Sequence, residues 1–132
     1  MKTYISHSPE ETKKIAAEFA KIVRQTHYKI NVFALSGDLG SGKTTFVQGF
    51  AKGLEIKDKI ISPTFVLIRE HKIPDSIKTL VHIDLYRLET IDPESLGISE
   101  IISNPQNIVL IEWAEKIKNL LPKETIWITF EI

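Results

Sequence analysis

The stretch that decides the fold runs from residue 37 to residue 44 and reads Gly37-Asp38-Leu39-Gly40-Ser41-Gly42-Lys43-Thr44. It fits the pattern G-x-x-x-x-G-K-[ST] at every fixed position. A loop that wraps a phosphate must turn sharply and bring backbone N–H groups within hydrogen-bond reach, and glycines permit this without a side chain in the way. The stretch therefore predicts a phosphate-binding loop (P-loop). In it, Lys43 reaches the β- and γ-phosphates of a nucleotide and the Thr44 hydroxyl is a magnesium ligand.

The flanking residues supply the context that such a loop requires. Val32 to Leu35 form an apolar run with the length of a short buried strand, and Lys43 to Leu54 have helical periodicity with apolar residues on one face. A helix that starts at the loop directs its dipole and its free N–H groups at an anion. With glycine near 7% of residues, the four fixed positions arise by chance in roughly one chain of this length in a few hundred. The strand and the helix argue against the alternative, a glycine-rich turn with an incidental lysine.

The rest of the chain alternates between predicted strands and helices. A capping box formed by Ser8 and Glu11 begins the first helix, with Pro9 at its first position. Two strands around a turn at residues 73–76 are expected to pair as an antiparallel hairpin. The predicted strands after the P-loop helix are 64–68, 79–83, 107–111 and 125–132, and the predicted helices are 92–102 and 114–121. This order predicts a single domain over residues 1–132 with a three-layer α/β P-loop NTPase fold and a mixed, mostly parallel central sheet.

The composition excludes several classes of site. Lys plus Arg equal Asp plus Glu at 17 each, so no basic excess attracts nucleic acid over a distance. The chain has no cysteine, which excludes disulfides, zinc–cysteine sites and thiol catalysis. No apolar run approaches the ~20 residues that span a bilayer, and residues 1–11 lack the apolar core of a secretory signal. We therefore expect a cytoplasmic protein without a membrane partner.

Two acids stand at the ends of apolar strands, where a P-loop site needs an acidic residue to hold magnesium directly or through water. The predicted strand 107–111 leads into Glu112, and the predicted strand 79–83 leads into Asp84. Either acid could meet the metal and either could position the attacking water, so both are candidate metal ligands and candidate catalytic residues. The alternative for each is a solvated strand end in a loop.

The histidines lack the companions of a metal site. His82 lies two residues before Asp84 and shares its strand face if the alternation holds. We expect it to be a structural histidine with a satisfied hydrogen bond rather than a catalyst. His7, His27 and His71 have no carboxylate or histidine at metal-ligand spacing, and we expect them at the surface.

Three further residues have open interpretations. Trp113, beside Glu112, is either core packing or a wall of the site, whereas Trp127 in the last strand is expected in the core. Thr64 lies between the P-loop helix and the next strand, in a region where nucleotide switches place a threonine that senses the γ-phosphate. On chemistry alone, an ordinary strand entry is the stronger explanation of this segment.

Four segments together resemble the TsaE (YjeE) family of bacterial P-loop ATPases, which support threonylcarbamoyladenosine modification of tRNA. The segments are Gly37-Asp38-Leu39-Gly40-Ser41-Gly42-Lys43-Thr44-Thr45, Ser62-Pro63-Thr64-Phe65, His82-Ile83-Asp84-Leu85-Tyr86-Arg87-Leu88 and Ile111-Glu112-Trp113-Ala114-Glu115. Their order and separations match the family across about residues 5 to 130. Many NTPases share the first segment, but the combination is highly specific.

The resemblance implies the ligands of the site. ATP would lie at Asp38, Leu39, Gly40, Ser41, Gly42, Lys43, Thr44 and Thr45. Magnesium would lie at Thr44 and Glu112, with Asp84 close to the metal and to the reacting water. The resemblance also makes Thr64 a switch residue, and it places further nucleotide contacts near the N-terminus, where Ser8 and Thr12 are candidates.

The resemblance also implies partners. These are the threonylcarbamoyl-transfer enzyme TsaD and its companion TsaB, and tRNA is reached indirectly through their complex. In that system a protein of this family does not transfer the carbamoyl group. Its ATP cycle resets the complex between turnovers.

The small number of arginines and the absence of a guanine-selecting motif favour an ATPase over a small-molecule kinase or a GTPase. The arginines are Arg24, Arg69 and Arg87, fewer than a small-molecule P-loop kinase usually needs to neutralise two phosphate-bearing substrates. Arg87 is the best internal candidate for a catalytic arginine finger, and a surface ion pair is its alternative. The guanine-selecting sequence Asn-Lys-x-Asp is absent, so we expect ATP to be preferred over GTP. We expect an ATPase that is slow alone and activated by its partners, with a small-molecule kinase or a non-catalytic nucleotide-sensing module as the alternatives.

Overall fold

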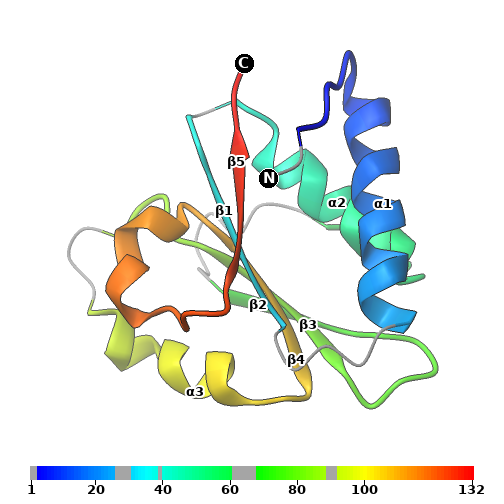
Figure 1. Ribbon diagram of the computed structural model, residues 1–132. Helices are drawn as coiled ribbons and strands as arrows, with labels where there is room; N and C mark the ends of the chain where they lie inside the picture. The colour runs from blue at the N-terminus through cyan, green and yellow to red at the C-terminus, as the bar shows by residue number, and fades with distance from the viewer. Residues whose placement is uncertain (1–2, 26–30, 39, 61–67, 89–91) are drawn as a thin grey trace.

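A five-stranded sheet forms the centre of the computed structural model, which describes residues 3–25, 31–38, 40–60, 68–88 and 92–132 (Figure 1). The strands lie in the order β2-β3-β4-β1-β5. In chain order, they are β1 (Val32–Gly37), β2 (Ile68–Lys72), β3 (Thr79–Asp84), β4 (Asn107–Glu112) and β5 (Ile126–Phe130). Neighbouring strands pair in parallel except β2, which is antiparallel to β3. The chain thus has the predicted α/β fold with a mixed, mostly parallel sheet.

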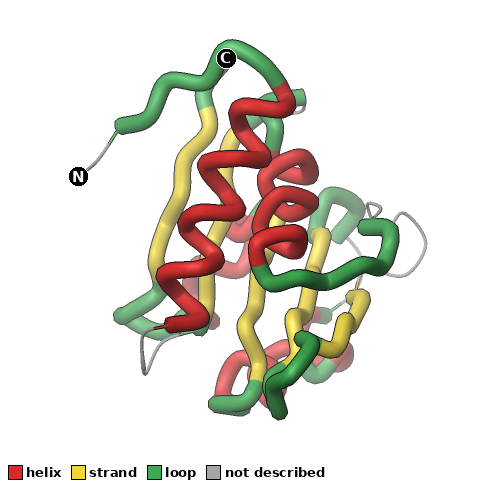
Figure 2. Tube along the Cα trace, turned by 90° about the vertical axis from the view of Figure 1, so that its right-hand side faces the viewer, coloured by secondary structure: helices red, strands yellow, loops and turns green. Residues whose placement is uncertain are grey.

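Helices cover both faces of this sheet. One layer contains α1 (Pro9–Gln25) and α2 (Lys43–Gly53), which stand in front of the strands in Figure 2. The other layer contains the 3₁₀ helices η1 (Pro93–Leu96) and η2 (Ala114–Leu120) and the short helix α3 (Ile98–Ser103). Each layer has its own apolar core against the sheet. The described residues include no helix with both the length and the apolar character needed to cross a bilayer.

The apolar run at the start of β1 reflects burial on both faces of the sheet. Phe33 and Leu35 belong to the core beneath α1 and α2, whereas Val32 and Ala34 belong to the core on the opposite face. Alternate side chains therefore enter different cores, and all of them are buried. This is the usual pattern of a parallel strand that is covered on both sides.

The layer of α1 and α2 begins as predicted and is closely packed. The Ser8 hydroxyl oxygen accepts a hydrogen bond from the Glu11 backbone N–H at 3.1 Å, and the Glu11 carboxylate accepts one from the His7 N–H at 2.8 Å. Further along, the two helices meet at glycines. A Cβ atom added at Gly49 would lie 2.4 Å from the Lys13 Cα, and one added at Gly53 would lie 2.4 Å from the Ala17 carbonyl oxygen. Glycine at both positions permits this approach of the two backbones.

The hairpin exists, and its first strand, as far as the structure describes it, extends through polar residues that the prediction did not include. β2 occupies Ile68–Lys72 and pairs with β3 from Ile68 opposite Ile83 to Lys72 opposite Thr79. The predicted strand 64–68 therefore shares a single residue with β2, and residues 64–67 lie outside the described residues. The prediction followed the apolar run, whereas an edge strand accommodates the polar residues that follow it.

The predicted helix over residues 92–102 is interrupted. The Asp92 carboxylate accepts the Glu94 N–H at 3.1 Å and caps η1, and α3 follows after a break. The break is at Gly97, whose φ of 72° is left-handed. Glycine adopts this conformation at little steric cost and ends a helix there.

Two predictions of burial are wrong. Trp127 is 40% exposed, because β5 is an edge strand whose other face, with Ile126, Ile128 and Phe130, packs on the core beneath α1 and α2. His71 is buried instead of lying at the surface, and its Nδ1 atom lies 3.1 Å from the Asp58 carboxylate.

Candidate functional site

The ends of three parallel strands bring the predicted site together. Asp84 and Glu112 are the last residues of β3 and β4 and pair directly with each other in the sheet. β1 lies on the other side of β4, and its last residue begins the P-loop. Because the carboxyl ends of parallel strands meet at one edge of a sheet, this edge is where an α/β fold binds its ligands.

The backbone of the P-loop has the conformation that its glycines predict. Gly37, Gly40 and Gly42 have φ angles of 143°, 78° and 107°. A Cβ atom added at Gly40 or Gly42 would meet nothing within 4 Å, so the loop borders open space at these positions. Gly42 is also the N-cap of α2, and no described side chain caps the helix there. The N–H groups of its first turn are therefore available to an anion, as phosphate binding requires.

Lys43 places a cation inside the loop. Its ammonium group donates hydrogen bonds to the Gly37 and Asp38 carbonyl oxygens at 2.5 and 2.9 Å, and it lies 3.4 Å from the Ser41 hydroxyl oxygen. Burial lowers the pKa of Lys43, and the carboxylates of Glu112, Glu115, Asp84 and Asp38 oppose this shift. Four acids thus act to keep a buried ammonium charged beside the loop.

A chain of side-chain hydrogen bonds connects α2 with β4 and β3. The Thr44 hydroxyl donates to Oε1 of Glu112 at 2.8 Å, and Nε2 of His82 lies 2.6 Å from Oε2 of the same carboxylate. His82 and Glu112 are both buried. Nε2 of His82 therefore has a hydrogen-bond partner, as expected, but this partner is one of the two predicted acids. The predicted magnesium ligands Thr44 and Glu112 are in direct contact.

Asp84 lies next to these hydrogen-bonded side chains, and a backbone N–H group binds its carboxylate. Its Oδ1 atom accepts the Tyr86 backbone N–H at 3.0 Å, and the residue is buried. With Thr44 and Glu112 it forms a set of oxygen donors, which is the ligand type that Mg²⁺ prefers. Within the described ranges, no three His, Asp or Glu side chains are grouped as a metal site. This is compatible with Mg²⁺, which usually takes one or two carboxylates together with substrate phosphates and water.

Trp113 forms a wall of the site. It has a left-handed backbone with φ 61°, which is unusual for a bulky residue. The face of its indole ring lies 4.1 Å from the Lys43 ammonium nitrogen. The ring also packs partly on the core of the second layer, so both interpretations of Trp113 hold in part.

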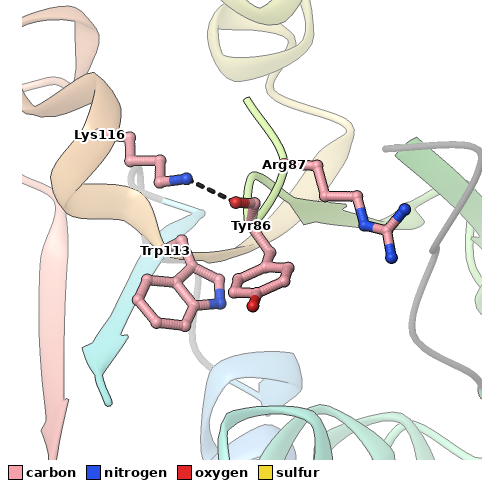
Figure 3. A pocket seen from close by; sticks show the side chains of 4 residues that line it. All are labelled: Tyr86, Arg87, Trp113 and Lys116. Atoms are coloured by element: carbon pink, nitrogen blue, oxygen red, sulfur yellow. Dashed lines mark hydrogen bonds between the residues drawn. The ribbon is translucent and has the colours of Figure 1, made fainter. Parts of the chain in front are cut away.

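A pocket of about 350 Å³ opens next to Trp113 and is lined by Tyr86, Arg87, Trp113 and Lys116 (Figure 3). The Tyr86 and Trp113 rings lie 5.3 Å apart, and Lys116 donates to the Tyr86 carbonyl oxygen at 2.6 Å. In Figure 3 the Arg87 guanidinium points away from Trp113. Arg87 is exposed, and no ion pair joins it to another described residue. No pattern in the sequence singles out Lys116, which reaches this pocket from η2.

The remaining predicted site residues lie in different surroundings. Thr45 is half-buried in the first turn of α2, and Asp38 is exposed in the loop. Leu39 and Thr64 lie outside the described residues. The candidate contacts near the N-terminus are engaged locally, because Ser8 caps α1 and the Thr12 hydroxyl lies 2.7 Å from that of Ser6.

Comparisons with known proteins identify the family of the chain. The sequence matches the family model of "Threonylcarbamoyl adenosine biosynthesis protein TsaE" over residues 6–132. The tRNA threonylcarbamoyladenosine biosynthesis protein TsaE of Bacillus subtilis is 42% identical over 94% of this chain and 73% of the relative, and that of Rickettsia bellii is 41% identical over 97% and 85%. The crystal structure of Bacillus subtilis YdiB superposes with a TM-score of 0.72 at 37% identity, covering 94% of this chain and 72% of that one. The chain therefore belongs to the TsaE family, a membership that implies nucleotide binding.

Proposed function

We propose that residues 1–132 form a single ATPase domain that acts in threonylcarbamoyladenosine modification of tRNA in the cytoplasm. The observation that carries the proposal is the 2.8 Å contact between Thr44 and Glu112 beside the buried Lys43 ammonium. A glycine-rich turn without function would not need a cation, a hydroxyl and a buried carboxylate at one strand end. The membership in the TsaE family supplies the process in which the site would work.

The proposed cradle for ATP extends from Asp38 to Thr45. The first-turn N–H groups of α2 and the Lys43 ammonium would hold the β- and γ-phosphates. Thr44 and Glu112 would hold Mg²⁺ directly or through water, with Asp84 beside them. The bound ion would supply positive charge that offsets the charge of the phosphates during transfer.

The remaining residues would orient the attacking water and complete the charge around the γ-phosphate. Asp84 is the proposed partner of the water, since its carboxylate lies beside Glu112 at the same edge of the sheet. Thr64 is the proposed switch residue, and Arg87 is the proposed finger. Because the Arg87 side chain is exposed at the pocket, a bound partner is needed to fix it in a working position.

We propose TsaD and TsaB as these partners, with tRNA reached through their complex. A cradle with magnesium binds nucleotide but does not by itself neutralise the full charge of the transition state. Hydrolysis should therefore be slow in the isolated protein and faster with the complex.

A steady-state ATPase assay with and without reconstituted TsaD and TsaB tests the proposal. We expect low turnover alone, higher turnover with the complex, and better competition for the site by ATP than by GTP. Equal rates across a range of partner concentrations would remove the case for partner activation. Tight ATP binding with no turnover under either condition would favour a non-catalytic nucleotide-sensing module.

A further inference from the structure

His82 is a buried polar residue between two apolar residues of β3. It lies in the middle of β3 between Val81 and Ile83, pairs with Leu110 of β4 and with Arg69 of β2, and has no exposed surface. Its Nδ1 atom has no hydrogen-bond partner among the described residues. The ring therefore makes its side-chain hydrogen bond to a single group, the Glu112 carboxylate.

The geometry of the carboxylate gives this bond a direction. Oε1 of Glu112 accepts from the Thr44 hydroxyl at 2.8 Å, and Oε2 lies 2.6 Å from Nε2 of His82. A carboxylate accepts hydrogen bonds, so the Nε2–H group is the donor. The imidazole of His82 on β3 binds one carboxylate oxygen, and the hydroxyl of Thr44 at the start of α2 binds the other. The orientation of Glu112 is thereby fixed at both atoms.

We propose that His82 is a positioning residue for the metal site, because it holds the Glu112 carboxylate in the orientation that meets Thr44. The inference rests on the proposed magnesium role of Thr44 and Glu112. An apolar residue would pack equally well in this strand, but it would leave a buried carboxylate oxygen without a donor. The carboxylate would then turn toward another donor or toward water and lose its alignment with Thr44. Hydrogen-bonding partners of this kind, one step removed from the metal, typically change metal affinity 10–100-fold when they are replaced.

The experiment compares two substitutions of His82 with a matched control. His82→Leu removes the donor and keeps an apolar side chain of similar size. His82→Gln retains an N–H group at about the reach of Nε2. His71→Leu is the control, because His71 is also buried on a strand and also lies 3.1 Å from a carboxylate, that of Asp58, which belongs to no predicted site.

The measured quantity is the magnesium concentration that half-saturates the binding of a fluorescent ATP analogue, with binding in EDTA measured separately. For His82→Leu we expect an increase of about tenfold or more, with binding in EDTA within twofold of the wild type. His82→Gln should recover most of the loss, and His71→Leu should show none. In a Glu112→Gln background, His82→Leu should add no further change, because the group that it positions is already altered.

The outcomes separate this inference from the proposed function. If the wild type binds the analogue without any dependence on magnesium, the proposed metal site fails. If the wild type depends on magnesium and His82→Leu keeps the wild-type half-saturation, the positioning role fails. Equal losses with and without magnesium in both His82 variants would reduce His82 to a packing role and would also overturn the inference.

A measurement on the wild-type protein covers the case in which His82→Leu does not fold. In protein labelled with ¹⁵N at histidine, adding magnesium to the nucleotide-bound form should shift the ring nitrogen signals of His82 and leave those of His71 in place. Unchanged His82 signals would overturn the positioning role without requiring any substitution.

Discussion

The two helical layers on the sheet are built differently. The layer of α1 and α2 has continuous helices of 17 and 11 residues that approach backbone to backbone at Gly49 and Gly53. Its core contains packed phenylalanine rings, such as the Phe19 and Phe33 pair with centroids 5.5 Å apart. The opposite layer has helices of 4, 6 and 7 residues, with left-handed residues at Gly97 and Trp113.

The buried residues of the site and the exposed residues of the pocket come from different parts of this architecture. Lys43 and Thr44 start a helix of the closely packed layer, and the two acids end strands next to it. The exposed residues of the pocket, Tyr86, Arg87 and Lys116, belong to the turn after β3 and to the short helix η2. A phosphate site needs atoms held in place, whereas a surface for a partner needs accessible side chains.

The largest effect should come from a substitution at the start of α2, in the closely packed layer. Lys43→Ala removes the cation proposed to face the β- and γ-phosphates, so we expect hydrolysis to be abolished and nucleotide affinity to fall. Phosphate release and titration with a fluorescent ATP analogue measure the two effects. Lys52→Ala is the matched control, because Lys52 is an exposed lysine in the last turn of the same helix. Wild-type turnover in Lys43→Ala would contradict the assignment of the loop.

The next largest effects should distinguish the roles of Asp84 and Glu112, the two acids that end β3 and β4. Glu112→Ala should raise the magnesium requirement of nucleotide binding by about 10–100-fold, because the proposed direct or water-mediated ligand is lost. Asp84→Ala should lower turnover more than binding, because its proposed role is near the reacting water. Magnesium titrations and turnover rates on both variants test this division, with the exposed Glu100→Ala on α3 as the control. If neither variant changed either quantity, both acids would be ordinary strand ends.

A third effect compares the stability of the two layers by making the same change in each. Gly49→Ala forces a methyl group against the Lys13 backbone, so the free energy of unfolding should fall by about 1–3 kcal/mol. Gly97→Ala meets no neighbouring atom but keeps a φ of 72°, and should cost about 1 kcal/mol. Urea unfolding measures both values. A gain in stability for Gly49→Ala, as expected of a helix interior with free space, would contradict the close packing of α1 and α2.

The smallest effect should come from the exposed tryptophan at the edge of the sheet. Trp127→Ala should change the free energy of unfolding by less than about 1 kcal/mol, because the side chain is 40% exposed. Phe33→Ala on the adjacent strand β1 should cost about 3–5 kcal/mol, since Phe33 is fully buried. Urea unfolding of the two variants gives the comparison. Similar losses would show that the outer face of β5 is covered in solution.

The sequence predicted the parts of the molecule that local pattern determines. The P-loop and the strand ends at Asp84 and Glu112 could be found because a phosphate loop needs glycines at fixed spacing and a parallel strand covered on both faces is an apolar run. The start of α1 at Ser8 followed from capping chemistry in the same way. These features depend on residues that are close together in the chain.

The rest depended on which elements become neighbours. Trp127 lies in a strand with the composition of a core strand, and its exposure follows from the position of β5 at the edge of the sheet. The bond from His82 to Glu112 joins residues 30 positions apart on two strands. Strand order and register create both results, and neither leaves a trace in local spacing.

The contact between Trp113 and Lys43 allows intrinsic tryptophan fluorescence to report on the position of the lysine. The chain has two tryptophans, and replacing the exposed Trp127 by phenylalanine leaves a single indole, whose face lies 4.1 Å from the P-loop ammonium. A charge at that distance acts on the ring electrostatically. Any displacement of Lys43 then changes the field at the chromophore, and the emission wavelength follows the lysine without an added dye.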